Sequence, residues 1–182
     1  MSVTAEPQRS GLTWEAFIEL PDELLKHAEL LDGEVHQVAS PARPHQQTLI
    51  NLIGAMLPWV QTHGGEIAPD IHVQIAARRG YQPDLAWYEP ARVPASGNYI
   101  APPNFVVEIL SPSTRRTDGL RKPTDYFSVG VQEMWLIDVD ARWVIALRPT
   151  SLSSEWRDGD TITTPVLPGF EIAVTDLIPQ VS

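Results

Sequence analysis

A glutamate stands among apolar residues in a segment with the character of a buried strand. The segment NFVVEIL, residues 104–110, is short, β-branched and bounded by prolines. Side chains alternate between the two faces of a strand, and both faces around Glu108 are apolar. A buried carboxylate without a partner is costly or is driven to its neutral form. We therefore expect Glu108 to have a partner, either a cation or a proton.

Asp84 raises the same question on a neighbouring segment. In QPDLAWY, residues 82–88, it shares a face with Ala86 and Tyr88, and aspartate is disfavoured in strands. Two carboxylates on adjacent strands could hold a hard divalent cation such as Mg²⁺, which prefers oxygen ligands. The structural alternative is that Asp84 caps the strand and Glu108 pairs with an arginine. These residues alone leave both alternatives open.

A basic run follows the Glu108 strand. Residues 115–122, RRTDGLRK, carry four basic residues and one acidic residue, in a chain whose net charge is −10. A polyanionic substrate would find a favourable potential there. A solvated loop and helix start would show the same composition. Because the run begins seven residues after Glu108, we expect it to lie near the carboxylates.

Several short motifs in a fixed order resemble the Uma-two-type restriction endonuclease domains of bacteria. They are LLDGE at residues 30–34, SPxxxH at 40–45, PD at 83–84, VVEILSPST at 106–114, KPTDY at 122–126 and GVQEMWLID at 130–138. Each motif is weak alone, and their order is specific. The resemblance covers residues 13–178, nearly the whole chain.

The resemblance implies membership of the PD-(D/E)XK nuclease superfamily. It implies an α/β fold of the mixed α+β type, with a central mixed sheet flanked by helices, and hydrolysis of phosphodiester bonds with Mg²⁺ or Mn²⁺. Asp84 and Glu108 would bind the metal together with the backbone carbonyl of Ile109. The usual lysine, two positions after the glutamate, is replaced by Leu110. In this family the lysine comes from the following helix, which points to Lys122.

Further residues are assigned to the same pocket by the resemblance. Glu34 would complete the outer shell of the metal or hold a second cation. His45 would contact a phosphate or act as an acid or base, unless it is simply an exposed histidine near a helix cap. Pro123 disfavours helical geometry for Lys122, so the helix starts at Pro123 or starts near residue 118 and kinks. Arg121 is then the substitute cation, able to orient a water or stabilise negative charge.

Two other functions compete with a nuclease. A catalytically silent scaffold or binding protein of the same fold would explain the missing lysine of the motif and the acidic composition. A sugar hydrolase could use Asp84 and Glu108 as an acid and base pair. It would act in the presence of EDTA and would leave the basic run unexplained.

The composition narrows these classes. The 182 residues include no cysteine, which excludes disulfides, thiolate catalysis and cysteine zinc sites. The net charge of −10 argues against broad nucleic-acid binding but allows a local basic site. Without an apolar run of about 18 residues or a signal peptide, we expect a cytoplasmic protein without a membrane segment. The expected partner is nucleic acid, and of the nucleic acids we expect DNA. The expected assembly is a homodimer, by analogy with related nucleases.

The site depends on elements that the pattern also predicts. We expect a flexible N-terminus over residues 1–12 and one domain over residues 13–182. A hairpin is expected around Asp32-Gly33, and a long helix over residues 45–62, where apolar residues recur at three- and four-residue steps. The other predicted elements are strands at 66–77, 82–88, 104–110, 133–139 and 142–147, and a helix within 118–129.

Overall fold

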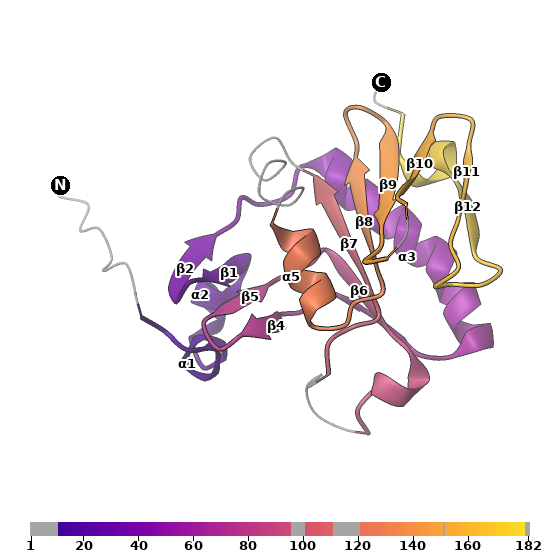
Figure 1. Cartoon of the computed structure of the whole chain (residues 1–182). Helices are drawn as coiled ribbons and strands as arrows, with labels where there is room; N and C mark the ends of the chain where they lie inside the picture. Colours follow the sequence, from indigo (N-terminus) through magenta and orange to yellow (C-terminus); the bar gives the residue numbers. More distant parts are fainter. Residues whose placement is uncertain (1–10, 96–100, 111–120, 151, 181–182) are drawn as a thin grey trace, which may run out of the picture. The chain divides into compact units, whose positions relative to one another are not determined.

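The chain forms two compact units. The computed structural model describes residues 11–95, 101–110, 121–150 and 152–180. The first unit comprises Met1–Ala39 with His72–Gln82, and the second comprises Ser40–Ile71 with Pro83–Ser182. Both are drawn in Figure 1. The single domain over residues 13–182 stays a prediction, and residues 1–10 of the expected flexible N-terminus lie outside the described residues.

The first unit is a small antiparallel sheet with two short helices. Its elements are α1 (Trp14–Ile18), α2 (Asp22–Leu25), β1 (Ala28–Leu31), β2 (Glu34–Gln37), β4 (Val73–Ala76) and β5 (Arg79–Tyr81). The strands lie in the order β2-β1-β5-β4. The predicted hairpin is confirmed, because Leu31 pairs with Glu34 and the turn residues Asp32 and Gly33 have positive φ angles of 53° and 86°.

The second unit is built on a six-stranded mixed sheet. Its elements are α3 (Arg43–His63), β3 (Glu66–Pro69), β6 (Leu85–Tyr88), η1 (Pro90–Arg92), β7 (Phe105–Leu110), α5 (Lys122–Ser128), β8 (Glu133–Asp138), β9 (Trp143–Leu147), β10 (Ser154–Arg157), β11 (Thr161–Thr163), β12 (Glu171–Ala173) and α6 (Val174–Leu177). The sheet order is β10-β9-β8-β7-β6-β3. Strands β7 and β8 are parallel and the other neighbours are antiparallel. The predicted mixed sheet flanked by helices is therefore confirmed.

Helices α3 and α5 cover opposite faces of this sheet. Leu52 and Met56 of α3 pack in the main core with Val107 and Ile109 of β7. Glu108 alternates with those two strand residues, so it faces the other side, where α5 lies. In Figure 1, α3 runs behind the strands and α5 lies in front of them. No helix in the described ranges is both long and apolar enough to cross a bilayer.

The long helix begins two residues earlier than predicted. It runs over Arg43–His63 rather than 45–62. Pro44 lies in its first turn, where a backbone N–H would have no partner within the helix, so the proline costs no hydrogen bond. The helix continues through Pro58, and Gly64 follows its last residue with a φ of 81°.

The predicted strand over residues 66–77 is wrong. The segment forms two strands in different sheets, β3 in the second unit and β4 in the first. Asp70 separates them with a φ of 52°, a left-handed conformation that interrupts an extended chain. Arg79 and Gly80, between the two predicted strands, instead belong to β5, which pairs with β4.

Candidate functional site

Strands β6 and β7 bring Asp84 and Glu108 to neighbouring positions. Leu85 pairs with Val107 across the two antiparallel strands, and Asp84 immediately precedes Leu85 while Glu108 immediately follows Val107. The backbone N–H of Ile109 donates to Asp84 Oδ2 at 2.6 Å. The carboxylate thus caps the end of the strand pair, as the structural alternative expected. The cap also fixes Asp84 beside the backbone of Ile109.

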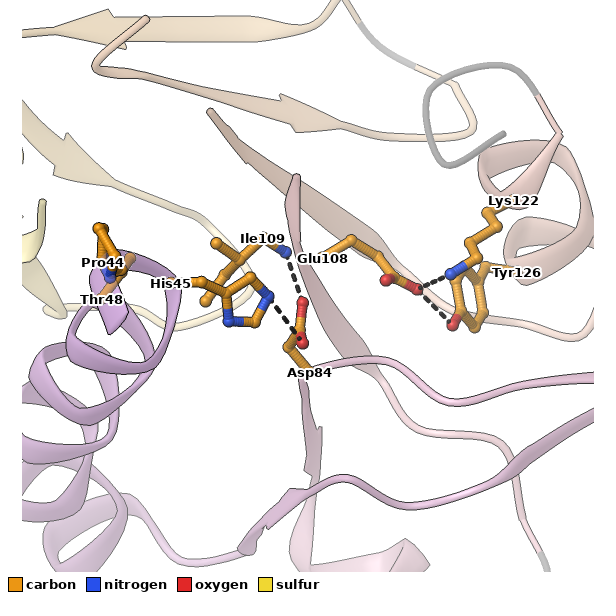
Figure 2. Close-up of polar contacts among 8 residues, drawn as sticks. All are labelled: Pro44, His45, Thr48, Asp84, Glu108, Ile109, Lys122 and Tyr126. Carbon is orange, nitrogen blue, oxygen red and sulfur yellow. Dashed lines mark hydrogen bonds and ion pairs between the residues drawn. The ribbon is translucent and has the colours of Figure 1, made fainter. Parts of the chain in front are cut away.

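Glu108 is buried and has a cation as its partner. Its Oε1 atom accepts hydrogen bonds from Lys122 Nζ at 3.0 Å and from the Tyr126 hydroxyl at 2.9 Å. Figure 2 shows both donors reaching the same oxygen. Only 4% of Glu108 and 3% of Lys122 is exposed, so each charge offsets the cost of burying the other. The expected cationic partner is therefore present, as Lys122.

Helix α5 delivers both donors. It begins at Lys122, with Pro123 in its first turn, which is close to the first of the two predicted starts. Lys122 and Tyr126 are four residues apart and so share one face of the helix. Arg121 precedes the helix and forms an ion pair with Asp125 at 3.7 Å. Most of the predicted basic run, residues 115–120, lies outside the described residues.

His45 meets Asp84 from the start of α3. Its Nε2 atom lies 3.2 Å from Asp84 Oδ1, and 13% of its side chain is exposed (Figure 2). Burial lowers the pKa of His45, but the hydrogen bond and charge of Asp84, the backbone of Ile109 and the charge of Asp70 raise it, and the net pKa is raised. The other ring nitrogen, Nδ1, is buried and has no hydrogen-bond partner among the described residues. The ring is thus a mostly buried imidazole that holds its proton more firmly than a free histidine does.

Glu34 belongs to the first unit. It is the first residue of β2, and its carboxylate lies 3.8 Å from His36 Nε2. Of the Glu34 side chain, 45% is exposed. Within the second unit the contacts form two groups that meet the same strand, His45 with Asp84 and Ile109, and Glu108 with Lys122 and Tyr126. The roles that the sequence assigned to members of these groups, and to Glu34, stay predictions.

The donors present fit a hard divalent cation. Asp84 and Glu108 carry carboxylate oxygens, and Ile109, whose backbone N–H bonds Asp84, carries the backbone carbonyl of the predicted ligand set. Within the described ranges, no three or more His, Cys, Asp or Glu side chains are grouped to hold a metal ion. Mg²⁺ is commonly held by one or two carboxylates, with water and substrate oxygens completing its shell. The donor chemistry therefore suits Mg²⁺ or Mn²⁺ better than a metal that requires a full cage of side chains.

Sequence reasoning missed two residues of this site. No site role was predicted for Tyr126, although its spacing from Lys122 in KPTDY could have placed both on one helix face. Asp70 was read as part of a continuous strand. Its backbone N–H instead donates to the carbonyl of Asp84 at 3.4 Å, and its charge acts on His45. The left-handed backbone that brings it there leaves no clear mark in the sequence.

Comparisons with known proteins agree with this architecture. The fold is similar to that of a crystal structure described as a putative nuclease belonging to DUF820, from Anabaena variabilis. The TM-score is 0.81 with 20% sequence identity, over 92% of this chain and 97% of that one. No curated protein gives a significant match. The model of the Uma2 family, described as "Putative restriction endonuclease", matches residues 14–175. The chain therefore belongs to the Uma2 family.

Proposed function

We propose that this protein is a metal-dependent endonuclease of the PD-(D/E)XK type that hydrolyses phosphodiester bonds in nucleic acid. We expect its substrate to be DNA. The observation that carries the proposal is the buried contact between Glu108 and Lys122, at 3.0 Å, on the strand next to Asp84. A carboxylate pair at adjacent strand ends beside a fixed cation suits phosphoryl chemistry, where charge must be neutralised. Family membership supports the same class of reaction.

Asp84, Glu108 and the carbonyl of Ile109 would hold the metal. A bound Mg²⁺ or Mn²⁺ would supply Lewis acidity toward the scissile phosphate. Asp84 is held for this task from two sides, by the N–H of Ile109 and by His45. Glu34 belongs to the first unit, and its role as an outer carboxylate for the cation stays a prediction from the sequence.

Lys122 would stabilise the negative charge that grows on the phosphate. Glu108 fixes its ammonium, which is buried away from water. The ammonium therefore needs little reorientation as the charge on the phosphate grows. His45, whose pKa is raised beside Asp84, would contact a phosphate oxygen or donate a proton to the leaving oxygen. Arg121 would contribute only a less focused positive charge, since it is engaged with Asp125. The homodimer and the cytoplasmic location expected from the sequence stay predictions.

The test is a Mn²⁺-dependent cleavage assay on supercoiled plasmid and on single-stranded DNA and RNA. We expect Asp84→Asn to abolish cleavage and Lys122→Met to lower kcat by about 100-fold or more, the effect of losing one group that stabilises the transition state. Arg121→Ala should retain most of the activity. The matched control is Asp158→Asn, which removes an exposed partner of Arg142 outside this site. Cleavage that survives EDTA or Asp84→Asn would contradict the proposal.

A silent nuclease-fold binding protein is the second candidate. It is favoured by the engagement of both carboxylates with protein partners and by the absence of a larger group of ligating side chains in the described part of the chain. Calorimetric titration with Mn²⁺ distinguishes the two candidates. Binding that is lost in Asp84→Asn and Glu108→Gln supports the enzyme, and no carboxylate-dependent binding supports the silent protein.

A further inference from the structure

We propose that Tyr126 is the positioning residue that fixes the Glu108 carboxylate for metal binding. The inference rests on the proposed function and adds to it a residue that does not touch the metal or the substrate. Tyr126 is fully buried, with 0% of its surface exposed, and its hydroxyl donates to Glu108 Oε1 at 2.9 Å. Figure 2 shows it beside Lys122, on the same side of the glutamate.

Two donors on one oxygen restrict Glu108 more than either donor alone. A glutamate has three side-chain torsions, so a single ion pair leaves its carboxylate free to turn. Lysine is a compact charge on a flexible stem of four carbons, which fixes direction poorly. Tyrosine has a rigid ring with two torsions, so its hydroxyl is held at one point once the ring is packed. Together the donors fix Oε1 and therefore the direction of the whole carboxyl group.

The origin of the lysine makes this second donor necessary. Leu110 occupies the strand position from which the superfamily lysine would extend, so the cation comes from α5 instead. The geometry of Glu108 then depends on how α5 is docked on the sheet. Tyr126 lies one helical turn after Lys122 and fastens the same helix to the same carboxylate.

The hydroxyl has a purpose that packing alone does not supply. A phenylalanine would fill nearly the same volume, and a buried hydroxyl without a partner would cost stability. The hydrogen bond to an ionised, buried acceptor is stronger than one between neutral groups, and exclusion of water strengthens it further. A tyrosine here therefore fits a role in orienting Glu108.

The experiment compares Tyr126→Phe with Tyr88→Phe, a buried tyrosine of β6 in the same unit. We expect Tyr126→Phe to weaken Mn²⁺ binding about 10-fold, the loss typical of residues that orient a metal ligand. Its kcat should fall while KM for the nucleic acid stays unchanged, because the buried hydroxyl does not contact substrate. Tyr88→Phe should keep both values. Incorporation of 3-fluorotyrosine at position 126, which retains the hydroxyl, should restore binding to within about 2-fold.

Each outcome decides the inference separately from the proposed function. Wild-type Mn²⁺ affinity in Tyr126→Phe would overturn the inference, as would an equal loss in Tyr88→Phe or failure of 3-fluorotyrosine to restore binding. If Tyr126→Phe does not fold, 4-fluorophenylalanine at position 126 takes its place, because it keeps the ring and removes the hydroxyl donor, and wild-type Mn²⁺ affinity in that protein would overturn the inference. Loss of binding in Asp84→Asn, measured in parallel, shows that the proposed metal site stands even if Tyr126 has no part in it.

Discussion

His45 links the candidate site to pH. Its pKa is raised above the ordinary value of 6.5, because the bond to Asp84 and nearby negative charges outweigh the lowering by burial. A group whose pKa is raised by folding adds stability that is fully present below its unfolded pKa and is lost as the pH rises through its folded pKa. The contact of His45 with Asp84 should therefore stabilise the protein at acidic pH and cease to do so at alkaline pH.

Urea unfolding of His45→Gln against the wild type checks this dependence. We expect the wild type to be the more stable protein at pH 5.5 and the difference to shrink by pH 8.5. His63→Gln, at the other end of α3, is the control, because His63 stacks on Trp59 rather than facing a carboxylate. A difference between wild type and His45→Gln that grows toward alkaline pH would contradict the assignment.

The sequence revealed which residues are unusual for their positions but not all the residues that they contact. Asp84 and Glu108 could be selected because carboxylates are rare among apolar strand residues. Lys122 came from the resemblance, and Pro123 left its direction undecided, since proline restricts the residue before it. Tyr126 could not be assigned from composition, because a tyrosine on a helix serves packing equally well.

The stability of the contact between α5 and β7 depends on one buried ion pair. Glu108 and Lys122 are both nearly buried, and removing either partner leaves the other as an uncompensated charge. We expect Lys122→Met alone to destabilise the protein by roughly 3–5 kcal/mol. The double variant Glu108→Leu/Lys122→Met should recover part of that loss, because an apolar pair of similar volume has no charge to desolvate, while the Tyr126 hydroxyl loses its Glu108 acceptor.

A double-mutant cycle by urea unfolding measures this coupling. The exposed pair of Arg142 and Asp158 supplies the comparison, since water screens it and its loss should change stability far less. Additive effects of the Glu108 and Lys122 substitutions would show that the contact carries no coupling. The same double variant should fold without cleaving nucleic acid, which separates stability from the proposed activity.

Elements with strong periodicity were predicted well, and irregular backbone was not. The apolar stripe of α3 and the β-branched run of β7 each specify one structure, and both are confirmed. The segment over residues 66–77 reads as one strand because Asp70 gives no turn signal as strong as a glycine. Its left-handed backbone sends β3 and β4 into different sheets. Only the packing of the strands reveals that break.

The acidic charge of the whole chain bears on how a metal would affect stability. The net charge is −10, so the negative charges of the folded protein repel one another. Any cation in solution screens part of that repulsion. A specific site behaves differently, because binding to the folded state alone stabilises by an amount set by the dissociation constant. At about 100 times that constant the gain is about 2.7 kcal/mol at one site.

Thermal unfolding with and without Mn²⁺ separates the two effects. We expect the wild type to gain stability in Mn²⁺ and to lose it again on addition of EDTA. Asp84→Asn and Glu108→Gln each remove one negative charge, and so does Asp158→Asn at an exposed position of the same unit. General screening would treat the three variants alike and would be reproduced by NaCl at matched ionic strength. A gain that disappears in the first two variants and persists in Asp158→Asn requires a cation held by Asp84 and Glu108, because only position distinguishes these equal changes of charge.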